Sequence, residues 1–153
     1  MTSIEPEGTK LRVLLIDDSP GDVRLTREAF LDADMQVEIF VATDGIEAMA
    51  FLQKSKIDPL AAHPDIILLD LNLPKMDGRE VLAKIKADPD LSLIPTIILT
   101  TSTAETDIQK SYQLRANCYL TKPVQLEEFQ SLVRSISDFW LMWAKLPKYG
   151  QTT

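Results

Sequence analysis

The chain has 153 residues, a length that predicts one domain and leaves little room for a second. Asp and Glu total 23 against 16 Lys and Arg, and this net charge of −7 argues against nucleic acid as the main partner, because duplex-binding surfaces are basic. Apolar residues make up 45%, enough for a full core, yet no apolar run reaches the ~18 residues of a membrane span. We therefore expect no membrane association.

The single cysteine, Cys118, cannot form an internal disulfide, which favours a reducing, cytoplasmic compartment. Residues 1–10 contain no hydrophobic segment, so we expect no signal peptide. The predicted domain covers residues 10–147, with flexible tails at 1–9 and 148–153.

Five short apolar segments alternate with amphipathic ones along the chain. The apolar segments, which we predict to be strands, are 11–16, 37–41, 66–69, 96–99 and 118–120. Apolar residues spaced three or four apart predict helices at 23–30, 46–52, 81–85 and 108–114, and a last helix from about Leu126 to about Trp143. Continuous apolar strands are typical of a parallel sheet covered on both faces. The pattern predicts a doubly wound α/β sandwich.

Polar residues stand where the predicted strands end. Asp17 and Asp18 follow the first strand, Asp70 follows the third, Thr100 ends the fourth, and Lys122 follows the fifth. In the flavodoxin-like strand order 2-1-3-4-5, these four strands are neighbours, and ligands bind at the carboxyl edge of such a sheet. We therefore expect the five residues to converge on one cleft.

The chemistry of this group indicates phosphoryl transfer. Two carboxylates about 4 Å apart repel by ~4 kcal/mol at an effective dielectric constant near 20, and a divalent cation relieves that repulsion. Ligation by oxygen atoms alone is what Mg2+ prefers. Lys122 offers a point charge and Thr100 a hydroxyl donor to phosphate oxygens. With Asp70 as a carboxylate nucleophile, the residues predict a phosphoryl-transfer site with Asp17, Asp18 and Asp70 at the metal.

Four motifs, all at predicted strand ends, resemble those of the response-regulator receiver family of two-component signalling. They are Ile16–Asp18, Leu69–Gly78, Leu99–Thr101 and Tyr119–Pro123, and the resemblance covers about residues 10–137. It implies the flavodoxin-like receiver fold with five strands and five helices. It also implies that Asp70 accepts a phosphoryl group from a phosphohistidine on a sensor histidine kinase.

The resemblance further implies a ligand set for Mg2+. Asp18, Asp70 and the Asn72 carbonyl would be direct ligands, and Asp17 would assist through water. The chain would then be a phosphoacceptor module that catalyses its own phosphorylation and dephosphorylation, and not an enzyme with a separate substrate.

The resemblance implies a switch as well. Thr100 and Tyr119 would change position on phosphorylation, and the change would be read out on the face formed by the fourth helix, fifth strand and fifth helix. Either Thr100 or Thr101 could face the cleft, depending on register, and the motif favours Thr100. The Lys122–Pro123 peptide bond is expected to be cis.

A narrower resemblance concerns the C-terminal third. The run 117–123, followed by the aromatic segment 139–143 and by Leu146–Pro147, is similar to single-domain regulators paired with cyanobacterial phytochromes. This similarity implies a phytochrome as the sensor kinase.

Two other functions on a similar fold remain open from the residues. A flavin-binding electron carrier needs a phosphate-cradling loop after the first strand, and Ser19–Asp22 offers one glycine and two flanking acids, a poor anion site. A carboxylate-nucleophile phosphohydrolase generally has a second acid two residues after the nucleophile, where this chain has Asn72.

The end of the last predicted helix is apolar on every side. A stripe that includes Trp140 and Trp143 can face the sheet, and Phe139, Leu141 and Met142 then point elsewhere. Packing within the chain is one explanation; self-association is favoured, because aromatic residues are enriched in interface cores. We predict a homodimer formed by the fifth strand and the flanking fourth and fifth helices, with the C-terminal extension contributing. The predicted interface residues are Tyr119, Phe139, Trp140, Met142 and Trp143.

Overall fold

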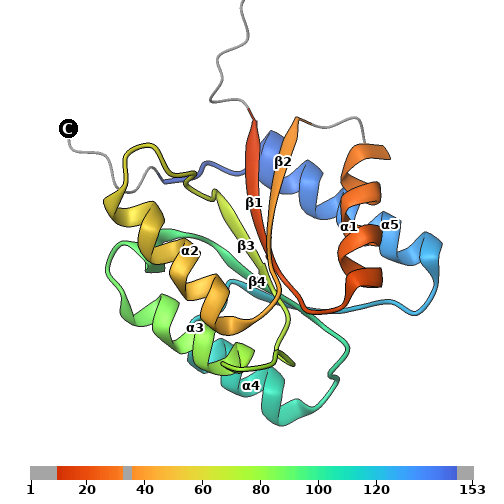
Figure 1. The fold of residues 1–153 in the computed structure, drawn as a ribbon. Helices are drawn as coiled ribbons and strands as arrows, with labels where there is room; N and C mark the ends of the chain where they lie inside the picture. The colour runs from red at the N-terminus through yellow and green to blue at the C-terminus, as the bar shows by residue number, and fades with distance from the viewer. Residues whose placement is uncertain (1–9, 33–35, 148–153) are drawn as a thin grey trace, which may run out of the picture.

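The computed structural model describes residues 10–32 and 36–147, which form one parallel sheet with helices on both faces (Figure 1). The strand order is β2-β1-β3-β4-β5. The strands are β1 (Leu11–Ile16), β2 (Val37–Ala42), β3 (Ile66–Leu69), β4 (Thr96–Thr100) and β5 (Cys118–Thr121). The predicted fold class and strand order are therefore confirmed.

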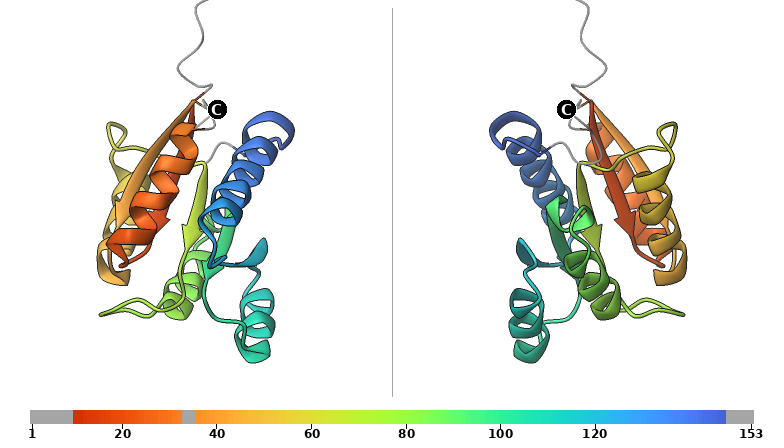
Figure 2. Two further views of the ribbon diagram at one scale, coloured as in Figure 1. Left: turned by 90° about the vertical axis from the view of Figure 1, so that its right-hand side faces the viewer. Right: turned by 90° about the vertical axis from the view of Figure 1, so that its left-hand side faces the viewer.

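Four α-helices connect the strands, a fifth follows β5, and the helices cover both faces of the sheet. They are α1 (Pro20–Asp32), α2 (Gly45–Ile57), α3 (Gly78–Ala87), α4 (Glu105–Gln113) and α5 (Leu126–Asp138). Helices α1 and α5 cover one face of the sheet, and α2 and α3 cover the other (Figures 1 and 2). A short 3-10 helix, η2 (Leu91–Leu93), precedes β4, and a π-helix, η3 (Phe139–Trp143), follows α5.

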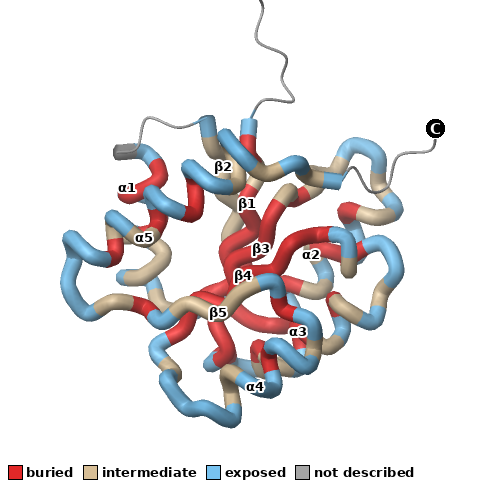
Figure 3. Tube along the Cα trace, turned by 180° about the vertical axis from the view of Figure 1, so that it is seen from behind, coloured by how far each residue is buried: buried red, intermediate tan, exposed pale blue. Residues whose placement is uncertain are grey.

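The core consists of two apolar clusters, one on each face of the sheet, and the strands between them are buried (Figure 3). Successive residues of a strand belong to opposite clusters, because successive side chains point to opposite faces of the sheet. Leu14 of β1 packs toward α2 and α3, whereas Leu15 packs toward α1 and α5. This burial on both faces explains why the strands are almost purely apolar in sequence.

Helices α1 to α4 begin one to three residues earlier than apolar spacing predicts, and side-chain caps fix the starts of α2 and α3. The Asp44 carboxylate accepts a hydrogen bond from the Glu47 N–H at 2.7 Å and caps α2. The Asp77 carboxylate accepts from the Arg79 N–H at 3.0 Å and caps α3. A search for apolar periodicity does not detect such residues.

The C-terminal segment differs from the predicted single helix to Trp143. The α-helix ends at Asp138, and the Ala144 N–H donates to the Phe139 carbonyl at 2.9 Å, five residues back. This wider turn rotates the side chains that follow it. Leu141 packs with the α1–α5 cluster, whereas Trp143, which was predicted to face the sheet, is 78% exposed.

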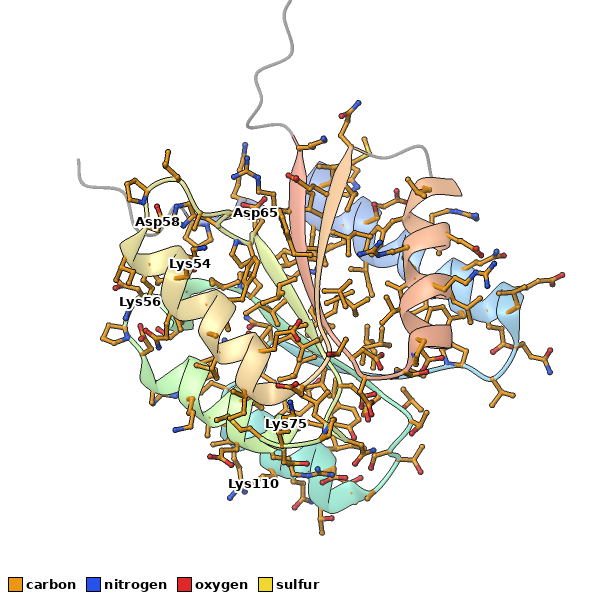
Figure 4. All side chains as sticks on the ribbon, in the orientation of Figure 1. Lys54, Lys56, Asp58, Asp65, Lys75 and Lys110 are labelled. Atoms are coloured by element: carbon orange, nitrogen blue, oxygen red, sulfur yellow. The ribbon has the colours of Figure 1, made fainter. Side chains whose placement is uncertain are left out.

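Ion pairs away from the cleft tie the helices together. At the far end of α2 the Lys56 ammonium lies 2.6 Å from Asp88, and Asp65 accepts a hydrogen bond from the Arg12 N–H (Figure 4). Lys75 lies at the opposite end of α2, where it pairs with Asp44 at 3.4 Å (Figure 4). The Lys56–Asp88 ion pair and the hydrogen bond to Asp65 both lie away from the carboxyl edge of the sheet.

Two expectations concern the ends of the chain and the membrane. The predicted tails, 1–9 and 148–153, lie outside the described residues. Within 10–32 and 36–147, no helix combines the length and apolar character needed to cross a membrane.

Candidate functional site

Backbone pairing that continues beyond the strands holds three polar residues side by side. The Asp70 N–H donates to the Ile16 carbonyl at 2.9 Å, and the Lys122 N–H donates to the Thr100 carbonyl at 2.7 Å. The Asp17 N–H donates to Ala42 of β2 at 3.0 Å. As a result, residues from β1, β3, β4 and β5 meet at the carboxyl edge of the sheet.

The Lys122 ammonium lies at the centre of this group. Its side chain is 4% exposed, and Nζ lies 2.8 Å from an oxygen of each of Asp17, Asp22 and Asp70. An ammonium has three hydrogens, so these three bonds use its full donor capacity. Lys122 is therefore a buried cation held entirely by carboxylates.

Burial and ion pairing act in opposite directions on the pKa values of these groups. Burial alone would lower the pKa of Lys122, but its hydrogen bonds to Asp17, Asp22 and Asp70 outweigh that effect and raise the pKa above its ordinary value. Burial raises the pKa of Asp17, and the hydrogen bond from Lys122 offsets only part of that rise. Lys122 therefore stays charged at neutral pH.

The second oxygen of Asp70 is held by two donors. The Thr100 hydroxyl donates to Asp70 Oδ1 at 2.8 Å, and the Asn72 N–H donates to the same oxygen at 3.2 Å. Thr100 is fully buried, whereas Thr101 is exposed. Asp70 is thus oriented by one hydroxyl, one amide and one ammonium.

The acids at the strand ends fit a divalent metal ion. Asp17, Asp18 and Asp70 each offer a carboxylate oxygen, and these atoms lie within 4.8 Å of one another. All three donors are hard oxygens, and Lys122 is the cation that the described structure places among them. Asp18 is exposed and borders an open hollow of about 500 Å3, so the group is accessible from solvent. Asn72, the fourth predicted ligand, is also exposed.

A chain of polar contacts leads from Arg79, in the first turn of α3, to the predicted switch residue Tyr119. Arg79 donates two hydrogen bonds of 2.8 Å to Asp107 of α4, and the Ser102 hydroxyl donates to the same carboxylate at 2.7 Å. The Arg79 guanidinium lowers the pKa of Asp107 to about 2. Tyr119 is half-buried, and its hydroxyl donates to the Ser102 carbonyl at 2.9 Å. Because the Ser102 hydroxyl bonds to Asp107, this contact links Tyr119 to α4.

One implied feature of the site is wrong in this structure. Across residues 10–32 and 36–147 every peptide bond is trans, including Lys122–Pro123, which was expected to be cis. The trans form of an X–Pro bond is favoured by about 0.5–1 kcal/mol. The ammonium of Lys122 reaches its three carboxylates from the trans form, so the contacts seen here do not require the cis form.

The predicted interface residues do not form one patch. Phe139, Met142 and Trp143 are 54%, 68% and 78% exposed, and they lie in η3. Trp140 is half-buried in the α1–α5 cluster and stacks edge-on with Phe139, with ring centroids 5.1 Å apart. Tyr119 packs with the cluster on the opposite face of the sheet.

Sequence reasoning did not assign Asp22, Arg79 or Asp107 to the site. Asp22 stands in the first turn of α1, where an acid is ordinary because it complements the helix dipole. Its position four residues after Asp18 is the signal that could have placed it at the same edge of the sheet. Nothing in the pattern of the chain pairs Arg79 with Asp107, since they belong to different helices.

A doubly wound parallel sheet with this acid group, buried lysine and buried threonine defines the class of protein. The model of the response regulator receiver domain matches residues 13–134, and the chain belongs to that family. It is therefore a response regulator receiver domain, a signalling module that works with a histidine kinase.

Its relatives include regulators from cyanobacteria. The chain is 47% identical over 135 residues to the response regulator Rcp1 of Synechocystis sp., covering 88% of this chain and 92% of Rcp1. The phosphorylated cyanobacterial phytochrome response regulator RcpA superposes with a TM-score of 0.85 at 46% identity, covering 91% of this chain and 99% of RcpA. Mn2+-bound Rcp1 gives 0.83 at 46% identity, covering 90% and 99%. These similarities do not favour the flavin carrier or the phosphohydrolase.

Proposed function

We propose that Asp70 accepts a phosphoryl group from a phosphohistidine of a sensor histidine kinase in a Mg2+-dependent reaction. The observation that carries this proposal is the environment of the Asp70 carboxylate. Thr100 and Asn72 fix one oxygen, Lys122 fixes the other, and Asp17 and Asp18 stand beside it. Each of these groups has a role in transferring a phosphoryl group to a carboxylate.

In the proposed reaction an oxygen of Asp70 attacks phosphorus, and the electron pair of the breaking P–N bond returns to the imidazole of the donor. Bound by Asp17, Asp18, Asp70 and the Asn72 carbonyl, Mg2+ would supply positive charge for the phosphoryl oxygens. The Lys122 ammonium leaves Asp70 and pairs with a phosphoryl oxygen, and the Thr100 hydroxyl donates to another. The chain thereby stabilises the charge that moves onto its own side chain.

The contacts of Tyr119 support an output on the face formed by α4, β5 and α5. If Thr100 follows the phosphoryl group, it leaves space behind it, and Tyr119, which pairs with Ile98 two residues before Thr100, is the side chain of β5 that would reorient. Its hydrogen bond to Ser102 and the pairing of Asp107 with Arg79 link that movement to α4. Reorientation of Tyr119 would thus be the local change, and α4 would be the helix that it displaces.

The particular kinase is part of the same proposal. RcpA is described as a phytochrome response regulator, and it shares 46% of its residues with this chain in a structural match. We propose a phytochrome as the sensor. A cytoplasmic location and the absence of any separate substrate belong to the proposal, and the free thiol of Cys118 suits a reducing compartment.

Replacing Asp70 by Asn should abolish phosphorylation. We expect wild-type protein incubated with acetyl phosphate and Mg2+ to gain the mass of one phosphoryl group. The Asp70→Asn variant should gain none, because an amide oxygen is a far weaker nucleophile than a carboxylate. Intact-mass spectrometry measures both.

The matched control is Asp65→Asn, because Asp65 is a partly buried acid at the opposite edge of the sheet (Figure 4). It should be phosphorylated like the wild type, and EDTA should abolish the reaction in both. Phosphorylation that persists in the Asp70→Asn variant would show that another residue is the acceptor.

We also propose a homodimer formed through the exposed apolar residues of η3. Phe139, Met142 and Trp143 present large apolar side chains to solvent in one short segment, and aromatic and Met side chains are enriched in interface cores. Trp140 would support Phe139 from behind through their edge-on contact. Tyr119, on the other face of the sheet, would take part only if the interface extends across the edge strand β5.

Truncating Trp143 to Ala should therefore weaken the dimer by about 30-fold in Kd or more, as expected for a central aromatic residue worth about 2 kcal/mol. Sedimentation equilibrium over a concentration series measures this change. Leu60→Ala is the control, since Leu60 is 94% exposed in the α2–β3 connection. Equal Kd values for the wild type and the Trp143→Ala variant would remove η3 from the interface.

A further inference from the structure

We propose that Asp22 is a positioning residue, which holds the Lys122 ammonium beside Asp70 while the other acids engage the metal and the phosphoryl group. This inference rests on the proposed role of Asp70 as the phosphoacceptor. Its basis is the contact between Lys122 Nζ and Asp22 Oδ2 at 2.8 Å, which ties the last strand end to the first turn of α1.

The donor capacity of Lys122 makes its three partners unequal. All three hydrogens of the ammonium are used, so a contact with a phosphoryl oxygen requires that one bond be given up. Two partners, Asp17 and Asp70, belong to the acid group that fits a metal ion, and on phosphorylation the negative charge at Asp70 moves from the carboxylate to the phosphoryl oxygens. Asp22 lies outside that group, so it can keep its bond to Lys122 throughout.

The backbone at Asp22 is fixed well enough to serve as an anchor. The Asp22 N–H donates to Ser19 Oγ at 3.3 Å, and the buried Thr26 hydroxyl donates to the Asp22 carbonyl at 2.8 Å. The Asp22 side chain is 30% exposed, against 2% for Asp17 and 9% for Asp70. It therefore holds Lys122 from the outer side of the cleft and confines it to the region of Asp70.

A different explanation is that Asp22 only complements the dipole of α1, as acids in a first turn do. The two explanations differ in their dependence on Lys122. A dipole effect is the same whether or not residue 122 is charged, whereas an anchor has no effect once the ammonium is gone. A double-mutant cycle between residues 22 and 122 separates them.

The test measures the phosphorylation rate of the full chain with acetyl phosphate at saturating Mg2+. We expect Asp22→Asn to lower the rate about tenfold, within the range of couplings in one ion-pair network. Glu28→Gln removes the same charge from α1 at an exposed residue that pairs with Arg24, and it should leave the rate within about twofold of the wild type. In a Lys122→Met background, Asp22→Asn should cause no further loss.

A second measurement needs neither phosphoryl donor nor metal. In EDTA, Asp22→Asn should lower the urea midpoint of unfolding, and the same change should leave the midpoint of the Lys122→Met variant unaltered. Equal effects of Asp22→Asn in both backgrounds, or a rate that rises when Asp22 is replaced, would overturn the inference. A wild type that takes up no phosphoryl group overturns the proposed function instead, and the unfolding cycle still decides whether Asp22 anchors Lys122.

Discussion

Replacing Lys122 by Met is expected to lower the free energy of unfolding by about 3–5 kcal/mol in metal-free buffer, the range seen when one partner of a buried ion pair is removed. The substitution retains most of the side-chain volume but leaves Asp17 and Asp70 buried without their cation. Each must then lose its charge or repel the other across the cleft. Urea unfolding followed by tryptophan fluorescence in EDTA measures the loss.

Mg2+ should restore much of this stability. In the wild type the Lys122 ammonium and a metal ion compete for oxygens of Asp17 and Asp70. In Lys122→Met the ammonium is absent, so the metal ion binds these carboxylates without competition. A ligand that binds the folded state stabilises it in proportion to the logarithm of its concentration over Kd, so the variant should gain more from a given Mg2+ concentration than the wild type does.

Lys56→Met is the control for this prediction. Lys56 also forms a short ion pair, 2.6 Å from Asp88, but its side chain is 23% exposed and it lies at the far end of α2. We expect a smaller loss of stability than for Lys122→Met, with no dependence on Mg2+. If Lys122→Met lowers the free energy of unfolding no more than Lys56→Met does, then removing the cation from the buried carboxylates does not destabilise the folded protein as their burial implies.

The positions of the strand-end residues were predictable because they depend on topology alone. Once five apolar runs are read as a parallel sheet, the residues after β1, β3 and β5 must share an edge, and Asp17, Asp70 and Lys122 do so. Contacts between elements were not predictable in this way. The pairing of Arg79 with Asp107 and of Asp22 with Lys122 depends on how far each helix extends past the sheet, which periodicity does not encode.

The π-helix at the C-terminus shows a second limit. Residues 139–143 are all large and apolar, so any helical period leaves an apolar face. The sequence therefore contains no signal to distinguish a turn of 3.6 residues from a wider one. The change in winding is what brings Leu141 into the core and exposes Trp143.

Gly78→Ala should damage stability and phosphorylation together. Gly78 is the buried first residue of α3, and its N–H donates to the Leu71 carbonyl at 2.9 Å. A Cβ at this position would overlap the carbonyl oxygen of Asp70 and the Cα of Leu71, which are backbone atoms and cannot rotate away. Either α3 or the end of β3 must move, so we expect a loss of about 3 kcal/mol, at the upper end of overpacking costs, or more.

The displacement also predicts a functional loss beyond the loss of stability. Because the obstructing atoms belong to Asp70 and its neighbour, the shift moves the carboxylate relative to Thr100 and Lys122, whose bonds to it are both 2.8 Å. Misplacement of a reacting group by about 1 Å can cost about 100-fold in rate. We expect the folded fraction of Gly78→Ala to be phosphorylated by acetyl phosphate at least tenfold more slowly than the wild type.

Gly21→Ala provides the matched control, since a Cβ at Gly21 in the first turn of α1 would meet no atom within 4 Å. There the change from Gly to Ala should stabilise the protein by up to about 1 kcal/mol, because Ala loses less backbone entropy in a helix. Opposite shifts in the urea midpoint for the two variants would tie the cost at Gly78 to the closeness of the Asp70 backbone. A Gly78→Ala variant as stable and as rapidly phosphorylated as the wild type would mean that α3 can move away from the end of β3 without disturbing the carboxylate.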